Sequence, residues 1–293
     1  MGRLRATLIL TGFLALTLPL MPLQALFVRV WPAAARRFPH WYHRQVCRLL
    51  GIRLHITGAV APGRPVLLVS NHTSWLDIPV LSAVAPVSFI AKREVGTWPF
   101  VSALARLQRT VFVDRDRKQA AGRSANQIAE RLGRRDTIVL FAEGTSSDGN
   151  RVLPFLTSLF GAAKPATEAS IGPPDDTVVQ TLSLVYTKLH GVPLGYSDRP
   201  GVGWYGDMEM TSHAWALLQA GPLDVSIDIG PPIPLAAFAD RKTLARHTEA
   251  EVRRNVVRLL RAAPPDYEIA VVAPRDTVAV RRPVSPAAAG KWR

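Results

Sequence analysis

The 293-residue sequence contains a single cysteine, Cys47. One thiol can form neither an intramolecular disulfide nor a metal site built from several thiolates. The chain therefore does not require an oxidising compartment, and we expect cytosolic exposure. His190 and His213 show no metal-ligand spacing with any carboxylate, so the sequence predicts no metal site and no resident cofactor.

Acidic residues are also scarce, since 22 Asp and Glu stand against 36 Lys and Arg, for a formal net charge of +14. A charge of this size implies attraction to an anionic surface, either nucleic acid or lipid head groups. Charge alone does not choose between these two partners. The choice depends on the N-terminal segment.

Charged residues are absent from positions 6–28, "ATLILTGFLALTLPLMPLQALFV". A helix of this length, rising about 1.5 Å per residue, spans the roughly 30 Å hydrocarbon core of a bilayer. A cleaved signal peptide has a shorter apolar region, and the nearest cleavage-like site, "AAA" at 33–35, lies beyond Arg29. The stretch predicts a membrane segment, so anionic lipid, not nucleic acid, is the expected partner. Pro19 and Pro22 leave open both a full span and a re-entrant hairpin in one leaflet.

Basic residues are distributed unevenly around this segment, because two arginines precede it and five follow it before residue 49. The positive-inside tendency then places the following domain in the cytoplasm. The stretch "RRFPHWYHR" at 36–44 is typical of an interfacial shelf, with Trp41 and Tyr42 at head-group level. The alternative is the solvated first helix of the domain.

From residue 62 onward, short β-branched runs alternate with longer helical patterns. The expected strands are 64–70, 87–92, 109–115, 136–143 and 178–187, and the expected helices are 75–84, 97–107, 117–134, 155–164 and 241–262. This alternation predicts an α/β fold with a largely parallel mixed sheet flanked by helices. We expect three units: a membrane-anchoring segment at 1–50, a folded domain at 51–262 and a flexible tail at 263–293.

Polar clusters follow three of the predicted strands, at 71–77 ("NHTSWLD"), 114–115 ("DR") and 143–150 ("EGTSSDGN"). Ligands of open α/β sheets bind outside the carboxyl ends of the strands. The three clusters therefore predict one candidate active site at one edge of the sheet.

His72 and Asp77 are five positions apart, about 140° from alignment on a regular helix. They meet only if His72 lies in the loop and Asp77 in the first turn of the following helix, as the strand-to-helix pattern predicts. A carboxylate on one imidazole nitrogen would fix the tautomer and leave the other nitrogen free to take a proton. The alternative is a capping box, with Ser74 as N-cap and Asp77 three residues later.

The other clusters offer groups that bind anions. Gly144, Thr145 and Ser146 directly follow Glu143 and a strand, where backbone N–H groups can converge on an anion or oxyanion. Arg115 offers a fixed cation for a phosphate. A base, an anion cradle, a membrane anchor and no nucleophilic cysteine together predict direct transfer onto a lipid hydroxyl.

Four blocks occur in order between about residues 50 and 190: "NHTSWLD", "AKREVGTWPF", "VFVDR" and "FAEGTSSDGNRVLPF". In these blocks the chain resembles the 1-acylglycerol-3-phosphate O-acyltransferase family, the lysophospholipid acyltransferases. The resemblance implies that His72 is the catalytic base and Asp77 its partner. It implies substrate binding by Lys92, Arg115, Glu143, Gly144, Thr145 and Ser146. It also implies an N-terminal helical element in the bilayer and a thioester donor, acyl-CoA or acyl carrier protein.

Two positions depart from the family pattern. Ser146 stands where E-G-T-R-S has an arginine, and Leu156 stands where a lysine usually follows Pro-Phe. The missing arginine puts recognition of a phosphate in doubt. Residues 190–218 resemble bacterial branches that include lyso-ornithine lipid acyltransferases, whose acceptor carries an amino-acid head group. Within them we interpret four residues as core or lid: Trp204, Tyr205, Asp207 and His213.

The sequence thus predicts a membrane-associated O-acyltransferase, with its 51–262 domain on the cytoplasmic side of a bacterial inner membrane. The predicted acceptor is 1-acyl-sn-glycerol-3-phosphate, giving phosphatidic acid in phospholipid biosynthesis, with lyso-ornithine lipid as the alternative. A hypothesis of another class is a non-catalytic, basic membrane-surface binding protein. It explains the charge and the anchor, but not the ordered polar clusters at strand ends.

Overall fold

The computed structural model of the protein describes residues 1–113, 118–163 and 173–261. This part contains a nine-stranded sheet in the order β1-β8-β6-β2-β5-β3-β4, and the short strands β7 and β9 pair with β6. The strands are β1 (Ile52–Thr57), β2 (Val66–Ser70), β3 (Val87–Lys92), β4 (Val111–Val113), β5 (Thr137–Phe141), β6 (Val178–Leu189), β7 (Val192–Pro193), β8 (Leu223–Ile229) and β9 (Ile233–Pro234). Along the main path the β6–β8 pair is antiparallel and the other pairs are parallel, which confirms the predicted fold class.

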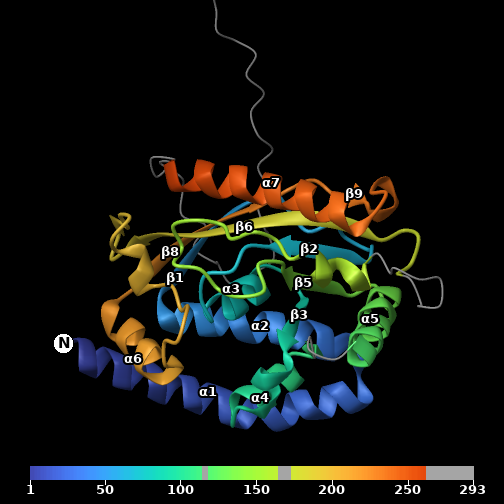
Figure 1. The fold of residues 1–293 in the computed structure, drawn as a ribbon. Helices are drawn as coiled ribbons and strands as arrows, with labels where there is room; N and C mark the ends of the chain where they lie inside the picture. Colours follow the sequence, from blue (N-terminus) through green and yellow to red (C-terminus); the bar gives the residue numbers. More distant parts are fainter. Residues whose placement is uncertain (114–117, 164–172, 262–293) are drawn as a thin grey trace, which may run out of the picture.

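Helices cover both faces of this sheet (Figure 1). They are α1 (Gly2–Val30), α2 (Pro32–Leu50), α3 (Asp77–Val84), α4 (Val101–Leu107), α5 (Lys118–Gly133), α6 (Met210–Ala220) and α7 (Arg241–Arg261), with the 3-10 helices η1 (Arg93–Thr97), η2 (Thr157–Ala162), η3 (Arg199–Gly201) and η4 (Leu235–Ala237). Helices α2 and α3 lie on one side, and α7 runs along the other (Figure 1).

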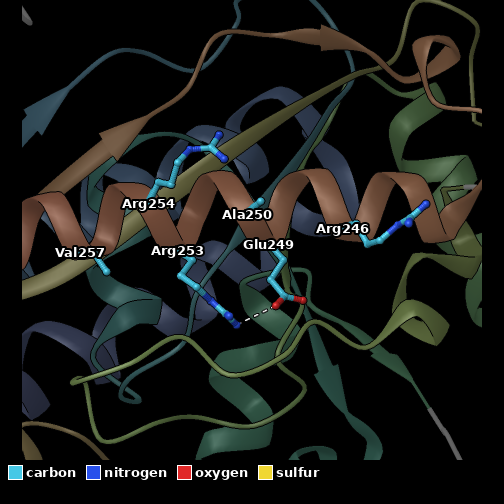
Figure 2. Close-up of a pocket in the computed structure, with 6 residues that line it drawn as sticks. All are labelled: Arg246, Glu249, Ala250, Arg253, Arg254 and Val257. Carbon is cyan, nitrogen blue, oxygen red and sulfur yellow. Dashed lines mark hydrogen bonds and ion pairs between the residues drawn. The ribbon is translucent and has the colours of Figure 1, made fainter.

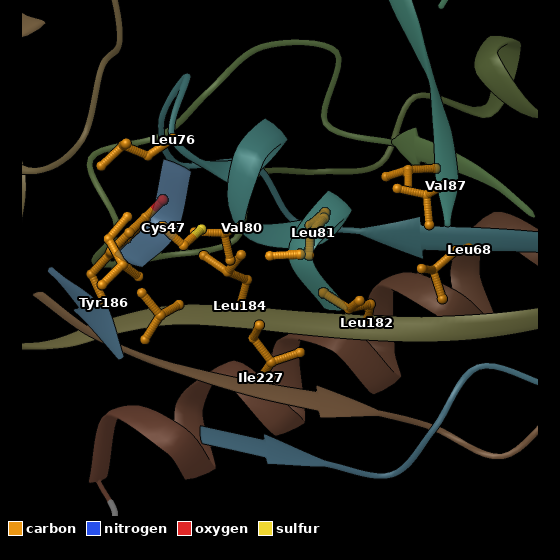
Figure 3. Close-up of a cluster of buried hydrophobic side chains, with 14 of the residues drawn as sticks. Cys47, Leu68, Leu76, Val80, Leu81, Val87, Leu182, Leu184, Tyr186 and Ile227 are labelled. Atoms are coloured by element: carbon orange, nitrogen blue, oxygen red, sulfur yellow. The ribbon is translucent and has the colours of Figure 1, made fainter. Parts of the chain in front are cut away.

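Strand β2 shows why the core has two halves. Successive side chains of a strand point to opposite faces, and all five β2 residues are buried. Leu68 belongs to the cluster that contains Cys47 of α2 and Leu81 of α3 (Figure 3). Leu67 belongs to the other cluster, together with Val252 of α7. A strand covered on both faces is expected to be a nearly continuous apolar run, as the first four residues of β2 are.

Helices α1 and α2 form an antiparallel hairpin that packs on the domain. Helix α1 continues through Pro19 and Pro22, and the chain reverses at Trp31. The α1 helix contacts α2, α4 and α6. The Arg5 guanidinium donates to the carbonyl groups of Leu50 and Leu218, near the ends of α2 and α6, which fixes the start of α1 to the domain.

Of the two aromatic residues that predict an interfacial shelf at 36–44, one is exposed as expected and the other is not. Trp41 is exposed, but Tyr42 turns inward, and its hydroxyl lies 2.7 Å from the Thr17 hydroxyl of α1. The neighbouring Pro39 is buried. The stretch belongs to helix α2, and one side of that helix packs against α3.

Other elements differ from the sequence prediction in length and kind. Residues 93–97 form a 3-10 helix and α4 begins at Val101, so the helix predicted at 97–107 is shorter than expected. The helix predicted at 155–164 is instead a 3-10 helix at 157–162. Strands β1 and β8 and helix α6 were not predicted. The predicted tail at 263–293 lies outside the described residues, and the proposed division into three units stays a prediction.

Candidate active site

His72 and Asp77 meet at the carboxyl end of β2. His72 lies in the loop, Asp77 begins α3, and the imidazole Nδ1 lies 2.7 Å from the carboxylate Oδ2. This is the geometry predicted from their spacing. Because the carboxylate can only accept, Nδ1 carries the proton and Nε2 carries the lone pair. The imidazole side chain is 18% exposed, whereas the Asp77 carboxylate is fully buried.

The Asp77 carboxylate also accepts hydrogen bonds from the loop that precedes α3. Its Oδ2 accepts from the backbone N–H groups of Thr73, at 2.7 Å, and Ser74, at 3.1 Å. The Ser74 hydroxyl is buried without a hydrogen-bond partner, and the N-cap position belongs to Leu76. The predicted capping box is therefore only half present. The same carboxylate that fixes the turn also fixes the imidazole.

Tyr186 of β6 completes the surroundings of Asp77. Its buried hydroxyl donates to the carboxylate Oδ1 at 2.8 Å. Burial and the nearby Asp77 charge raise the pKa of Tyr186 well above its ordinary value, so the phenol keeps its proton and remains a donor. The sequence predicts a strand at 178–187, but its place beside β2 and the residue that faces Asp77 depend on the strand order and register.

Phe141, the last residue of β5, supports the imidazole from one side. The two rings are stacked, with centroids 4.0 Å apart and an interplanar angle of 17°. The carboxylate on one nitrogen and the phenyl face together restrict how the ring can turn. They hold Nε2 as the nitrogen available to a substrate.

Glu143 lies directly after β5 and is buried. Its Oε1 accepts from the backbone N–H of His72, and its Oε2 accepts from the backbone N–H of Leu153, both at 2.8 Å. Burial raises the pKa of Glu143 to about 8 against the lowering effect of these two hydrogen bonds. The contacts make Glu143 a tie between the loop after β2 and a second point of its own loop after β5. Its predicted role in substrate binding stays a prediction.

The residues after Glu143 face the site in different ways. The Gly144 N–H donates to the Phe141 carbonyl in a turn, so an anion cradle here depends on Thr145 and Ser146. Thr145 is exposed, and Ser146 is buried with its hydroxyl donating to the carbonyl of Trp204.

The other two predicted substrate-binding residues differ in what the structure shows. Lys92, at the end of β3, is exposed and lines a cavity together with His72. Arg115 lies outside the described residues. Within the described part of the chain, no group of three or more His, Cys, Asp or Glu side chains could hold a metal ion.

The cavity beside His72 has a volume of about 930 Å³ and mainly apolar walls. Side chains of α1, α2, α4 and α6 and of both active-site loops line it. They include Phe13 and Leu20 of α1, Tyr42 of α2 and Leu104 of α4. The N-terminal hairpin thus forms a wall of the site, in addition to the membrane anchor that the sequence predicts.

A second hollow lies on α7 (Figure 2). It shares no lining residue with the cavity beside His72. Glu249 accepts from Arg253 at 2.7 Å and from the backbone N–H of Phe155 at 2.9 Å. These contacts tie α7 to the segment that follows Glu143, so they support the site from outside.

Comparisons with known proteins identify the family of this chain. The Acyltransferase family profile matches residues 51–185. A lyso-ornithine lipid O-acyltransferase of Brucella abortus is 48% identical over 86% of this chain and 94% of its own length. A 1-acyl-sn-glycerol-3-phosphate acyltransferase of Neisseria meningitidis is 30% identical over 72% and 77%.

The fold is also that of a solved structure. The crystal structure of a 1-acyl-sn-glycerophosphate acyltransferase from Thermotoga maritima covers 90% of this chain and 99% of its own, with a TM-score of 0.62 and 21% identity. That likeness supports the fold alone. Given the identity and coverage of the Brucella abortus relative, the chain belongs to the lysophospholipid acyltransferase family.

Proposed function

We propose that this protein transfers a fatty acyl group from a thioester, acyl-CoA or acyl carrier protein, to the hydroxyl of lyso-ornithine lipid at the membrane. The observation that carries the chemistry is His72, held by Asp77 and presented to a large apolar cavity. A lysolipid brings both a hydroxyl and an acyl chain, which require a base and an apolar space together.

His72 is the proposed general base. Its Nε2 takes the proton of the lysolipid hydroxyl as that oxygen attacks the thioester carbonyl, and Asp77 stabilises the imidazolium that forms. The tetrahedral intermediate collapses and the carbon–sulfur bond breaks. The leaving thiolate takes the proton from Nε2, so an ester and a free thiol result and His72 is neutral again.

Two observations support lyso-ornithine lipid as the acceptor. The Brucella abortus relative, at 48% identity, is named for lyso-ornithine lipid, whereas the Neisseria meningitidis relative at 30% is named for 1-acyl-sn-glycerol-3-phosphate. Ser146 replaces the arginine expected to hold a phosphate, and its hydroxyl is engaged by Trp204. These observations reverse the order of the two acceptors drawn from sequence alone, and 1-acyl-sn-glycerol-3-phosphate becomes the second candidate.

The way α1 packs supports the re-entrant over the spanning arrangement. Within the described residues, α1 is the one helix long and apolar enough to cross a membrane. Its exposed leucines include Leu4, Leu8, Leu18 and Leu26. At about 100° per residue these four lie within about 80° of one another, opposite the buried residues of α1. A helix with one face on the domain and the other apolar fits the plane of a single leaflet.

The activity is tested by free thiol release from acyl-CoA and from acyl carrier protein, each with lyso-ornithine lipid or 1-acyl-sn-glycerol-3-phosphate. We expect acceptor-dependent release with lyso-ornithine lipid, and its loss by about 10³-fold or more in His72→Ala without loss of folding. Absence of release with every donor and acceptor pair would favour a non-catalytic membrane-surface protein. Wild-type rates in His72→Ala would exclude the mechanism.

The membrane arrangement is tested by cysteine labelling, because Cys47 is buried and an introduced cysteine reports its own position. Arg3→Cys, at the start of α1, and Lys242→Cys, on α7, are compared with a membrane-impermeant maleimide in intact and opened spheroplasts. For an in-plane helix both cysteines should label only after opening. Labelling of Arg3→Cys alone in intact spheroplasts would instead show a full span.

A further inference from the structure

Residues 194–208 are attached to the active-site loops through the backbone of Trp204. The Trp204 N–H donates to the carbonyl of Thr73, next to His72, at 2.9 Å. The Trp204 carbonyl accepts from the Ser146 hydroxyl. Leu194 and Val202 of the same segment are buried in the core cluster of α2 and α3. The segment is therefore a fixed part of the site.

The Trp204 ring faces the cavity beside His72. Its Nε1 donates to the carbonyl of Met208 at 2.9 Å, which sets the orientation of the ring. Trp98, after η1, packs edge to face with it, with centroids 6.1 Å apart at 84°. Both rings line the cavity, and both are only partly buried. Two packed aromatic rings thus form part of the wall of the cavity that Ser146 also lines.

This wall has the chemistry of a site for a cation. Ring faces carry negative partial charge and attract ammonium groups, most strongly at tryptophan. An arginine at position 146 would point a positive charge at the same region, but the serine hydroxyl is engaged by Trp204. Lys92 lines the same cavity and can pair with a carboxylate. An amino-acid head group carries both an ammonium and a carboxylate, whereas a phosphomonoester carries only negative charge.

We propose that the Trp98–Trp204 wall is the acceptor-specificity element of this enzyme, and that it receives the ammonium of an amino-acid head group. This inference rests on the proposed acyltransferase function and names the residues that select the acceptor within it. The serine at position 146 is part of the same element, because its hydroxyl holds the segment that carries Trp204.

The test compares two acceptors that differ at one group: lyso-ornithine lipid with a free terminal amine, and the same lipid acetylated at that amine, which removes the positive charge. The ratio of their kcat/KM values is measured for wild type, Trp204→Phe, Trp204→Leu and Trp98→Leu. Neither Phe nor Leu keeps the Met208 hydrogen bond, so their difference reports the ring face. Tyr196→Leu changes an exposed aromatic residue of the same segment that does not line the cavity, and serves as control.

Wild type and Tyr196→Leu should prefer the free amine by about tenfold, the expected size of a desolvated cation–ring contact. Trp204→Phe should keep part of the preference and Trp204→Leu should lose it. Wild-type preference in both Trp204→Leu and Trp98→Leu would overturn the inference, as would wild-type enzyme that uses both lipids equally. If Trp204→Leu does not fold, Trp98→Leu decides by the same ratio. Wild-type enzyme inactive on both lipids but active on 1-acyl-sn-glycerol-3-phosphate would overturn the acceptor proposal instead, and with it this inference.

Discussion

The loops after β2 and β5 each hold a buried carboxylate at the same edge of the sheet, and the two carboxylates have different partners. Asp77 accepts from an imidazole and a phenol as well as from two backbone N–H groups. Glu143 accepts from two backbone N–H groups, one of them that of His72. One acid therefore orients a side chain that faces the cavity, and the other orients the backbone that carries it.

This difference matters because the sequence presents both acids in the same setting, a polar cluster that follows a strand. Burial next to a loop does not distinguish a group that acts on a reacting side chain from one that ties segments together. The distinction lies in the atoms that each carboxylate contacts. Asp77 contacts the His72 imidazole, so its loss should lower activity, whereas Glu143 contacts backbone N–H groups, so its loss should mainly lower stability.

The largest effect should come from Asp77→Asn compared with Glu143→Gln. An amide at 77 can donate to Nδ1 and turn the imidazole into the wrong tautomer, so we expect kcat to fall by about 10² to 10⁴. Glu143→Gln should lower kcat by less than tenfold, because no substrate-facing side chain loses a partner. Steady-state kinetics and thermal unfolding are measured on both variants.

The comparison fails if Glu143→Gln costs as much kcat as Asp77→Asn while remaining folded. That result would place Glu143 in the reaction itself. If Asp77→Asn lowered only the melting temperature, the carboxylate would serve as a helix cap alone.

Tyr186→Phe tests the role of Asp77 by removing one of its other hydrogen-bond partners. It removes only the hydroxyl that donates to Oδ1 and leaves a buried carboxylate oxygen without that donor. We expect kcat to fall about tenfold with little change in KM, and stability to fall by about 1.5–3 kcal/mol, the usual value of a hydrogen bond to a charged group. The measurement is a double-mutant cycle with Asp77→Asn.

If Tyr186 acts through Asp77, its effect on kcat should largely disappear in the Asp77→Asn background. A purely structural role for Tyr186 would give equal kcat losses in both backgrounds. Either result is informative, because Asp77→Asn keeps the shape of the side chain and Tyr186→Phe removes only the hydroxyl.

Glu143 should make stability depend on pH in a way that Gln does not. Its pKa is raised by burial to about 8 in the folded protein, above its ordinary value of 4.5. A raised pKa means that the folded state binds the extra proton, so this contribution to stability is present below about pH 4.5 and is lost as pH rises through about 8. The wild-type melting temperature should therefore fall relative to that of Glu143→Gln between pH 5 and 8. A difference that is constant over this range would show that Glu143 is ionised in the fold.

The sequence was sufficient for the elements whose signals are local. Strand β2 is a continuous apolar run, and the histidine and aspartate were placed by the strand-to-helix change between them. It was not sufficient for contacts set by register, such as Tyr186 to Asp77, or for β8, in which the polar residues Asp224, Ser226 and Asp228 alternate with apolar ones. Nor could composition show that α1 forms a wall of the cavity, because an apolar helix has the same sequence whether it meets lipid or protein.

The smallest expected effect concerns position 146, where this chain departs from its family. Ser146 is buried and its hydroxyl is hydrogen-bonded to the carbonyl of Trp204. An arginine at this position must therefore displace the segment that carries Trp204 before it can reach a phosphate. Ser146→Arg should raise the kcat/KM ratio of 1-acyl-sn-glycerol-3-phosphate over lyso-ornithine lipid by about fivefold, because a guanidinium pairs with phosphate through two parallel hydrogen bonds. Ser146→Leu is the control of similar bulk without charge, measured in the same competition assay at one salt concentration. If leucine raises the ratio as much as arginine does, the cause is displacement of Trp204 and not pairing with phosphate. If neither changes the ratio, position 146 does not select the acceptor, and the loop after β5 serves only to hold the loop after β2.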